Sequence, residues 1–144
     1  MIVAQRKNIP DLLAIVEKHR KLLVLGCGTC VTVCLAGGQR EVSIIASALR
    51  MAAKLKGLPL EVEEATIERQ CDNVFLEQAA EAVKQTDAVL SLACGAGVTP
   101  VWTRLSSASW RNEESGRRNA QPVARVCSTN TAGFVRSPAV PNTC

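Results

Sequence analysis

The stretch LLVLGCGTCVTVC, residues 22–34, begins as a short apolar run, reaches glycine, and is followed by three cysteines. A continuous apolar run of this length that ends in glycine predicts a β-strand covered on both faces. Strands of this kind belong to parallel sheets, in which helices lie on both sides. Cys27, Cys30 and Cys34 are therefore expected at, or just beyond, the carboxyl end of a buried strand.

Helical and strand patterns alternate through the first hundred residues. Helices are expected at residues 9–20, 40–56 and 72–85, and strands at residues 22–26, 60–65 and 87–93. Because the two alternate at the spacing of right-handed parallel crossovers, the sequence predicts an α/β fold, a small three-layer parallel sheet with helices on both faces. The acidic alternation of residues 60–65 places that strand nearer an edge.

The last third of the chain has a different composition. Residues 1–100 hold eleven Lys or Arg and eleven Asp or Glu, whereas residues 101–144 hold six Arg, no Lys and two Glu, so the net charge of +4 lies in that segment. No helical or strand period persists there, and the composition is typical of a GC-rich gene read in a shifted frame. We expect a cysteine-rich domain at residues 1–100 and an irregular, basic, low-order tail at residues 101–144. We interpret this tail as truncated or non-native in preference to a genuine flexible end of the chain.

Localisation and broad class follow from the same composition. Arg6 and Lys7 interrupt the region where a signal peptide would need an apolar stretch, and no window approaches the ~18 apolar residues of a membrane span. Six spaced arginines without lysine or interleaved aromatic residues make a poor nucleic-acid footprint. We expect a cytoplasmic protein with neither a membrane nor a nucleic-acid partner.

The positions of the cysteines are the main functional signal. Cys27 and Cys30 leave the first strand, Cys71 follows the second, and Cys94 ends the third. Since the carboxyl ends of parallel strands share one edge, where open α/β sheets build their sites, these thiols are expected to converge. Cys34 lies one helical turn beyond Cys30 and would face the same way. The five cysteines are the candidate metal ligands.

Thiolates are soft donors that hold either an iron–sulfur cluster or zinc, and four of them satisfy either one. The spacing alone does not select the metal. A third hypothesis makes Cys27 and Cys30 a C-x-x-C redox pair of a thiol oxidoreductase, but it leaves Cys71 and Cys94 unexplained. In the remaining alternative, the cysteines are small buried apolar residues with no chemical role. Three cysteines so close together beside glycines are unusual in that role.

Three motifs together resemble a known family. LVLGCGTCVTVCLAGGQREV, then TIERQCD and DAVLSLACGAGV, are similar to the C-terminal-domain-like family of methylenetetrahydrofolate reductase, whose members also occur as small separate subunits in acetogens and related anaerobes. The resemblance covers about residues 1–98. It implies an accessory protein with a [4Fe–4S] cluster, or alternatively zinc, that supports electron delivery to a flavin-containing catalytic subunit in one-carbon metabolism.

The resemblance also sets limits on this chain. It implies that the partner, the catalytic methylenetetrahydrofolate reductase subunit, binds folate and flavin, so no catalytic residue is expected here. It maps the metal ligands onto the same five cysteines without selecting four of them. Separate subunits of that family continue past CGAGV with a second, ferredoxin-like cysteine-rich stretch, whereas only Cys127 and Cys144 follow here, so a second cluster is not expected.

Overall fold

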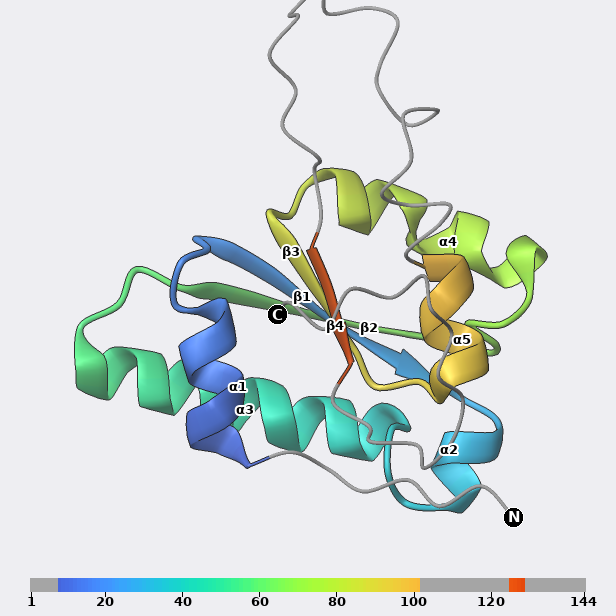
Figure 1. Ribbon diagram of the computed structural model, residues 1–144, viewed down its shortest axis with the longest axis horizontal. Helices are drawn as coiled ribbons and strands as arrows, with labels where there is room; N and C mark the ends of the chain where they lie inside the picture. Colours follow the sequence, from blue (N-terminus) through green and yellow to red (C-terminus); the bar gives the residue numbers. More distant parts are fainter. Residues whose placement is uncertain (1–7, 102–124, 129–144) are drawn as a thin grey trace, which may run out of the picture.

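The computed structural model describes residues 8–101 and 125–128. Over these residues four parallel strands form one sheet in the order β2-β1-β3-β4 (Figure 1). The strands are β1 (Lys21–Cys27), β2 (Glu61–Ile67), β3 (Ala88–Ser91) and β4 (Arg125–Ser128). The helices are α1 (Ile9–Val16), α2 (Cys30–Val33), α3 (Gln39–Lys56), α4 (Asn73–Lys84) and α5 (Gly95–Pro100). The predicted α/β architecture is confirmed.

Strand β1 forms the middle of the core, and all of its residues after Lys21 are buried. Side chains alternate across the sheet, so Leu22 and Val24 join the cluster under α1 and α3. Leu23 and Leu25 face the opposite cluster, which contains residues of α4 and α5. Figure 1 shows these two pairs of helices on opposite sides of the sheet. A continuous apolar run is what such a doubly covered strand requires.

The chain changes direction at β1. It passes from β1 through α3 to β2 on one side, and then through α4 to β3 on the other side of β1. Strands β1 and β3 are neighbours in the sheet. The connection after β1 leads away from β3 toward β2, and the connection after β3 leads away from β1 toward β4. This is the topological switch point at which open α/β sheets usually place a site.

The ends of the two long helices follow ordinary capping rules. The Glu41 carboxylate accepts a hydrogen bond from the Gly38 N–H at 2.9 Å at the start of α3. Gly57 ends that helix with φ of +67°, a left-handed conformation that glycine adopts without strain. Asp72 caps α4, accepting from the Val74 N–H at 3.0 Å, where the sequence predicted a helix start.

The segment expected to be an irregular tail contains one described strand. Strand β4 lies inside that tail and pairs in parallel with β3, with Cys127 opposite Leu90. A strand of four residues is too short to show a clear alternation of apolar and polar side chains. Its pairing therefore depends on the open edge of β3 and not on a sequence pattern of its own. The remaining tail residues after Val101 lie outside the described part of the chain. Within the described ranges, no helix is long and apolar enough to span a membrane.

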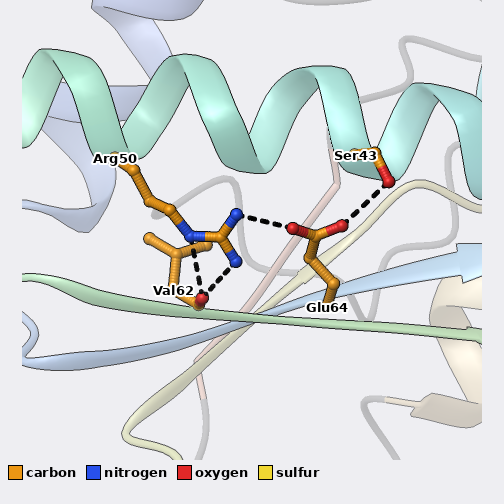
Figure 2. Close-up of polar contacts among 4 residues, drawn as sticks. All are labelled: Ser43, Arg50, Val62 and Glu64. Carbon is orange, nitrogen blue, oxygen red and sulfur yellow. Dashed lines mark hydrogen bonds and ion pairs between the residues drawn. The ribbon is translucent and has the colours of Figure 1, made fainter.

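Strand β2 lies at an edge of the sheet, as its acidic pattern predicted, and a polar group on α3 covers part of it (Figure 2). The Arg50 guanidinium donates to the Val62 carbonyl at 3.2 and 2.7 Å and to the Glu64 carboxylate at 2.6 Å. The Ser43 hydroxyl donates to the second Glu64 oxygen at 2.9 Å. These bonds hold the edge strand to the helix and lower the pKa of Glu64, with the Arg50 hydrogen bond as the largest cause.

We expect Glu64→Gln to destabilise the chain at neutral pH by less than about 1 kcal/mol, because the pair is partly exposed. Since the folded-state pKa of Glu64 is lowered, its stabilisation is present above the ordinary carboxyl pKa, about 4.3, and disappears as pH falls through the folded value. Urea unfolding at pH 7 and at progressively lower pH measures this. Glu63→Gln, an exposed neighbour on β2, is the matched control and should change little. A difference between wild type and Glu64→Gln that persists undiminished into strong acid would contradict the assignment.

Candidate metal centre

Cys27 is the last residue of β1, and its thiol is directed toward the connection after β2. Only 2% of the residue is exposed. Its backbone N–H donates to the Gly37 carbonyl at 2.9 Å, and its Sγ donates to the Glu68 carbonyl at 3.8 Å. The Sγ also lies 3.7 Å from the Thr29 hydroxyl oxygen. Contacts from the connections after β1 and β2 therefore hold this residue in place.

Cys30 and Cys94 bring together two connections that are far apart in the sequence. Cys30 begins α2 and is exposed, whereas Cys94 immediately precedes α5 and is buried. Partial burial, followed by the neighbouring thiols of Cys94 and Cys27, raises the pKa of Cys30 above its ordinary value. Two of the other predicted ligands, Cys94 and Cys27, thus lie close enough to Cys30 to raise its pKa.

Cys71 lies beside this group through its backbone. It follows the buried Gln70 and precedes the Asp72 cap of α4, so both of its neighbours are anchored. Gly97 of α5 packs against this segment, because a Cβ there would lie 3.1 Å from the Gln70 Cβ and 3.7 Å from the Cys71 nitrogen. The Cys71 side chain itself is exposed.

Cys34 is also exposed and ends α2, where its N–H donates to the Cys30 carbonyl at 3.3 Å. The next residue, Leu35, adopts a φ of +53°, which is uncommon outside glycine. The short helix therefore ends at Cys34, and the chain turns sharply toward α3. The thiols that act on the pKa of Cys30 are those of Cys94 and Cys27, so the predicted grouping of Cys34 with Cys30 stays a prediction.

A buried amide connects the three cysteine-bearing connections. Gln70 has no exposed surface; its Nε2 donates to the Leu25 carbonyl at 2.9 Å, and its Oε1 accepts from the Ser91 hydroxyl at 2.6 Å. The Ser91 oxygen in turn accepts from the Ala93 N–H at 3.3 Å. Leu25 lies two residues before Cys27, Ser91 three residues before Cys94, and Gln70 directly before Cys71. One side chain thus sets the relative positions of all three loops.

The loops also pack closely against each other through glycine. A Cβ on Gly37 would overlap the Leu92 carbonyl oxygen, so only glycine fits at this approach of the segment before α3 to the end of β3. The Gly28 N–H donates to the Ile67 carbonyl at 2.9 Å and joins the exit of β1 to the end of β2. The edge is therefore a well-defined surface in which neighbouring connections share hydrogen bonds.

The donor chemistry suits a thiophilic metal, but the side chains do not form a completed cage. Within residues 8–101 and 125–128, no three His, Cys, Asp or Glu side chains form a group able to hold a metal ion. Two exposed thiols, Cys34 and Cys71, adjoin the Cys27, Cys30 and Cys94 group along the backbone. The five cysteines fit a cluster or zinc in composition. Because rotation of the exposed side chains changes the sulfur positions without moving the sheet, the geometry of a metal site stays a prediction.

Sequence reasoning missed the residues that support the site. Gln70 is flanked by Arg69 and Cys71, and no pattern distinguishes a buried amide from an exposed one at that position. Ser91 interrupts the apolar run of β3, and a polar residue inside a buried strand was the available signal. The pair Gly37 and Gly38 was a second signal, since adjacent glycines often mark a close approach of backbones.

Comparisons of the chain with family models, with curated proteins and with solved structures find no match. The resemblance carried by the three cysteine motifs therefore stays a prediction, and the candidate site stands on its geometry and donor chemistry.

We expect Gln70→Leu to lower the free energy of unfolding by about 1–3 kcal/mol, since it removes two buried hydrogen bonds and leaves the Leu25 carbonyl without this donor. Gln78→Leu, an exposed position on α4, is the matched control and should change the value by no more than about 0.5 kcal/mol. Urea unfolding followed by far-ultraviolet circular dichroism measures both. Equal stabilities for the two variants would show that the Gln70 amide does not hold the loops together.

Proposed function

We propose that this chain is an accessory iron–sulfur protein that binds a [4Fe–4S] cluster at the carboxyl edge of its sheet. Cys27, Cys30 and Cys94 would supply three ligands, and Cys71 or Cys34 would supply the fourth. The observation that carries the proposal is that the thiols of Cys27 and Cys94, from two separate connections, both act on Cys30 and raise its pKa at the switch point between β1 and β3. Buried apolar cysteines would have no need to gather at the one edge where such sheets build sites.

The chemistry of the edge supports this role. Neighbouring thiols cannot all ionise cheaply, and a bound cation offsets the repulsion among their thiolates. Cys71 is the stronger candidate for the fourth ligand, because the glycine contact at Gly97 brings its backbone against the first turn after Cys94. When bound, such a cluster supplies one-electron transfer, while this chain holds it and provides the surrounding backbone donors that tune its potential.

The proposed partner is the flavin-containing catalytic subunit of methylenetetrahydrofolate reductase, to which this protein would help deliver electrons in one-carbon metabolism. The three cysteine motifs support this part of the proposal, through the resemblance described above. Val33 and Leu35, which flank Cys34, are 85% and 67% exposed. Exposed apolar side chains beside a redox group suit a surface that another protein covers.

The test is metal and sulfide analysis of the full chain purified without oxygen. We expect brown protein with about four irons and four sulfides per chain. Cys30→Ser and Cys94→Ser should each abolish cluster binding, although the two residues lie on different connections. Cys144→Ser is the matched control, because it lies outside all three motifs and should leave the iron content unchanged.

The same measurement separates the alternatives. A colourless chain with about one zinc, lost together with the fold on chelation, would replace the cluster with a structural zinc site. Iron retained in Cys94→Ser would refute the convergence of the two connections on one metal. Cys71→Ser and Cys34→Ser, compared side by side, identify the fourth ligand, and we expect the larger loss of iron from Cys71→Ser.

A further inference from the structure

The outward face of α3 carries an apolar stripe that is open to solvent. The inner face of this helix joins the core cluster and packs on β1, β2 and α1. On the other side, Ile44, Met51 and Leu55 are 49%, 62% and 89% exposed, and Ala48 lies in the same row. Three large apolar side chains aligned on one helix are a contiguous patch, and such patches mark interaction surfaces.

The spacing of the stripe is that of a coiled-coil seam. Its members, residues 44, 48, 51 and 55, are separated by four, three and four positions. Side chains at this spacing insert between those of a second helix that lies alongside. At 1.5 Å per residue the stripe is about 16 Å long, which is three turns of a partner helix. The stripe therefore suits a helical partner.

The cations of α3 differ in whether an acidic side chain neutralises them. Arg50 pairs with Glu64 at 2.6 Å, and Lys56 lies 3.9 Å from Glu17. A second pair of cations, Arg40 and Lys54, is exposed and forms no ion pair with any residue of the described ranges.

The two unpaired cations border the stripe. Arg40, the exposed Ser47 and Lys54 are spaced seven residues apart and so form a row along one side of it. Flanking positions of this kind carry the charges that select the partner helix and its orientation. The chain therefore neutralises the cations that lie away from the stripe and leaves those beside it available.

We propose that this face of α3 docks an acidic amphipathic helix of a protein partner. The apolar side of that helix covers the stripe, and carboxylates along one of its borders pair with Arg40 and Lys54. The inference uses neither the cysteines nor the proposed cluster, and it concerns a helix face away from the carboxyl edge of the sheet.

Two other occupants fit the charges less well. A second copy of this chain would bring the same arginine and lysine to the contact instead of the carboxylates that the row lacks. Helices that lie in a membrane surface carry aromatic side chains on the apolar side. The stripe has none, and its cations lie along one border only.

The test measures binding of labelled helical peptides to the full chain by fluorescence anisotropy. One peptide has leucine at the seam positions of each heptad and glutamate at the flanking positions, and the second has lysine in place of every glutamate. We expect the glutamate peptide to bind at least about tenfold more tightly, because it alone complements the basic row. The double variant Arg40→Glu, Lys54→Glu should reverse this preference.

Substitutions on the stripe test the apolar part of the contact. Leu55→Gln should weaken binding of the glutamate peptide by about tenfold or more. Because Leu55 is 89% exposed, the variant should fold as the wild type does, which circular dichroism checks. Lys56→Gln is the matched control, since Lys56 lies off the stripe and pairs with Glu17, and its affinity should stay within about twofold of wild type.

Failure of the glutamate peptide to bind, equal binding of the two peptides, or binding indifferent to Leu55→Gln would each overturn the inference. Sedimentation equilibrium of the chain alone tests the second copy, and vesicles of phosphatidylserine and phosphatidylcholine test the membrane. A dimer, or vesicle binding, that disappears in Leu55→Gln would assign the face to that other occupant and would also overturn the inference. Metal content of the same variants should equal that of wild type, so this result is independent of the proposed function.

Discussion

The arrangement of the whole edge depends on one buried amide, that of Gln70, which hydrogen-bonds a carbonyl of β1 and a hydroxyl of β3. A buried amide is tolerated only when its donor and acceptor are both used, so its position is strongly determined. Because Gln70 belongs to the connection after β2, its bonds tie that connection to the ends of both central strands. The cysteines next in sequence to these three anchors are thereby held along one rim.

The topology explains why the rim lies where it does. With β1 and β3 adjacent and their connections diverging, the ends of these two strands form the switch point at which open α/β sheets usually place a site. Glycine contacts at Gly37 and Gly97 then allow the neighbouring loops to approach closely. The result is a rigid edge made of shared backbone contacts, on which Cys27 and Cys94 are buried while Cys30 extends toward solvent. A fixed scaffold with accessible thiols is what the proposed metal site requires.

Much of this fold is readable from the chain. The apolar run of β1, the alternation of strand and helix, and the Asp72 cap all follow local rules, and the structure has the corresponding elements. The predicted approach of Cys30 to Cys94 follows from topology, since parallel strands bring their carboxyl ends to one edge. The support for that approach was not readable, because the burial of Gln70 depends on tertiary packing. Strand β4 was missed because four residues pair with an open edge without a pattern of their own, and the exposure of Cys34 and Cys71 depends on loop geometry.

The measurement that tests the account most directly is X-ray absorption at the metal edge of the full chain purified without oxygen. We predict a metal surrounded by sulfur at about 2.3 Å, with a neighbouring iron shell if the group is a cluster. The sulfur shell should lose amplitude in the chain that lacks the Cys94 thiol. A first shell of nitrogen and oxygen, or a sulfur shell indifferent to that thiol, would contradict the claim that the separate connections meet on one metal.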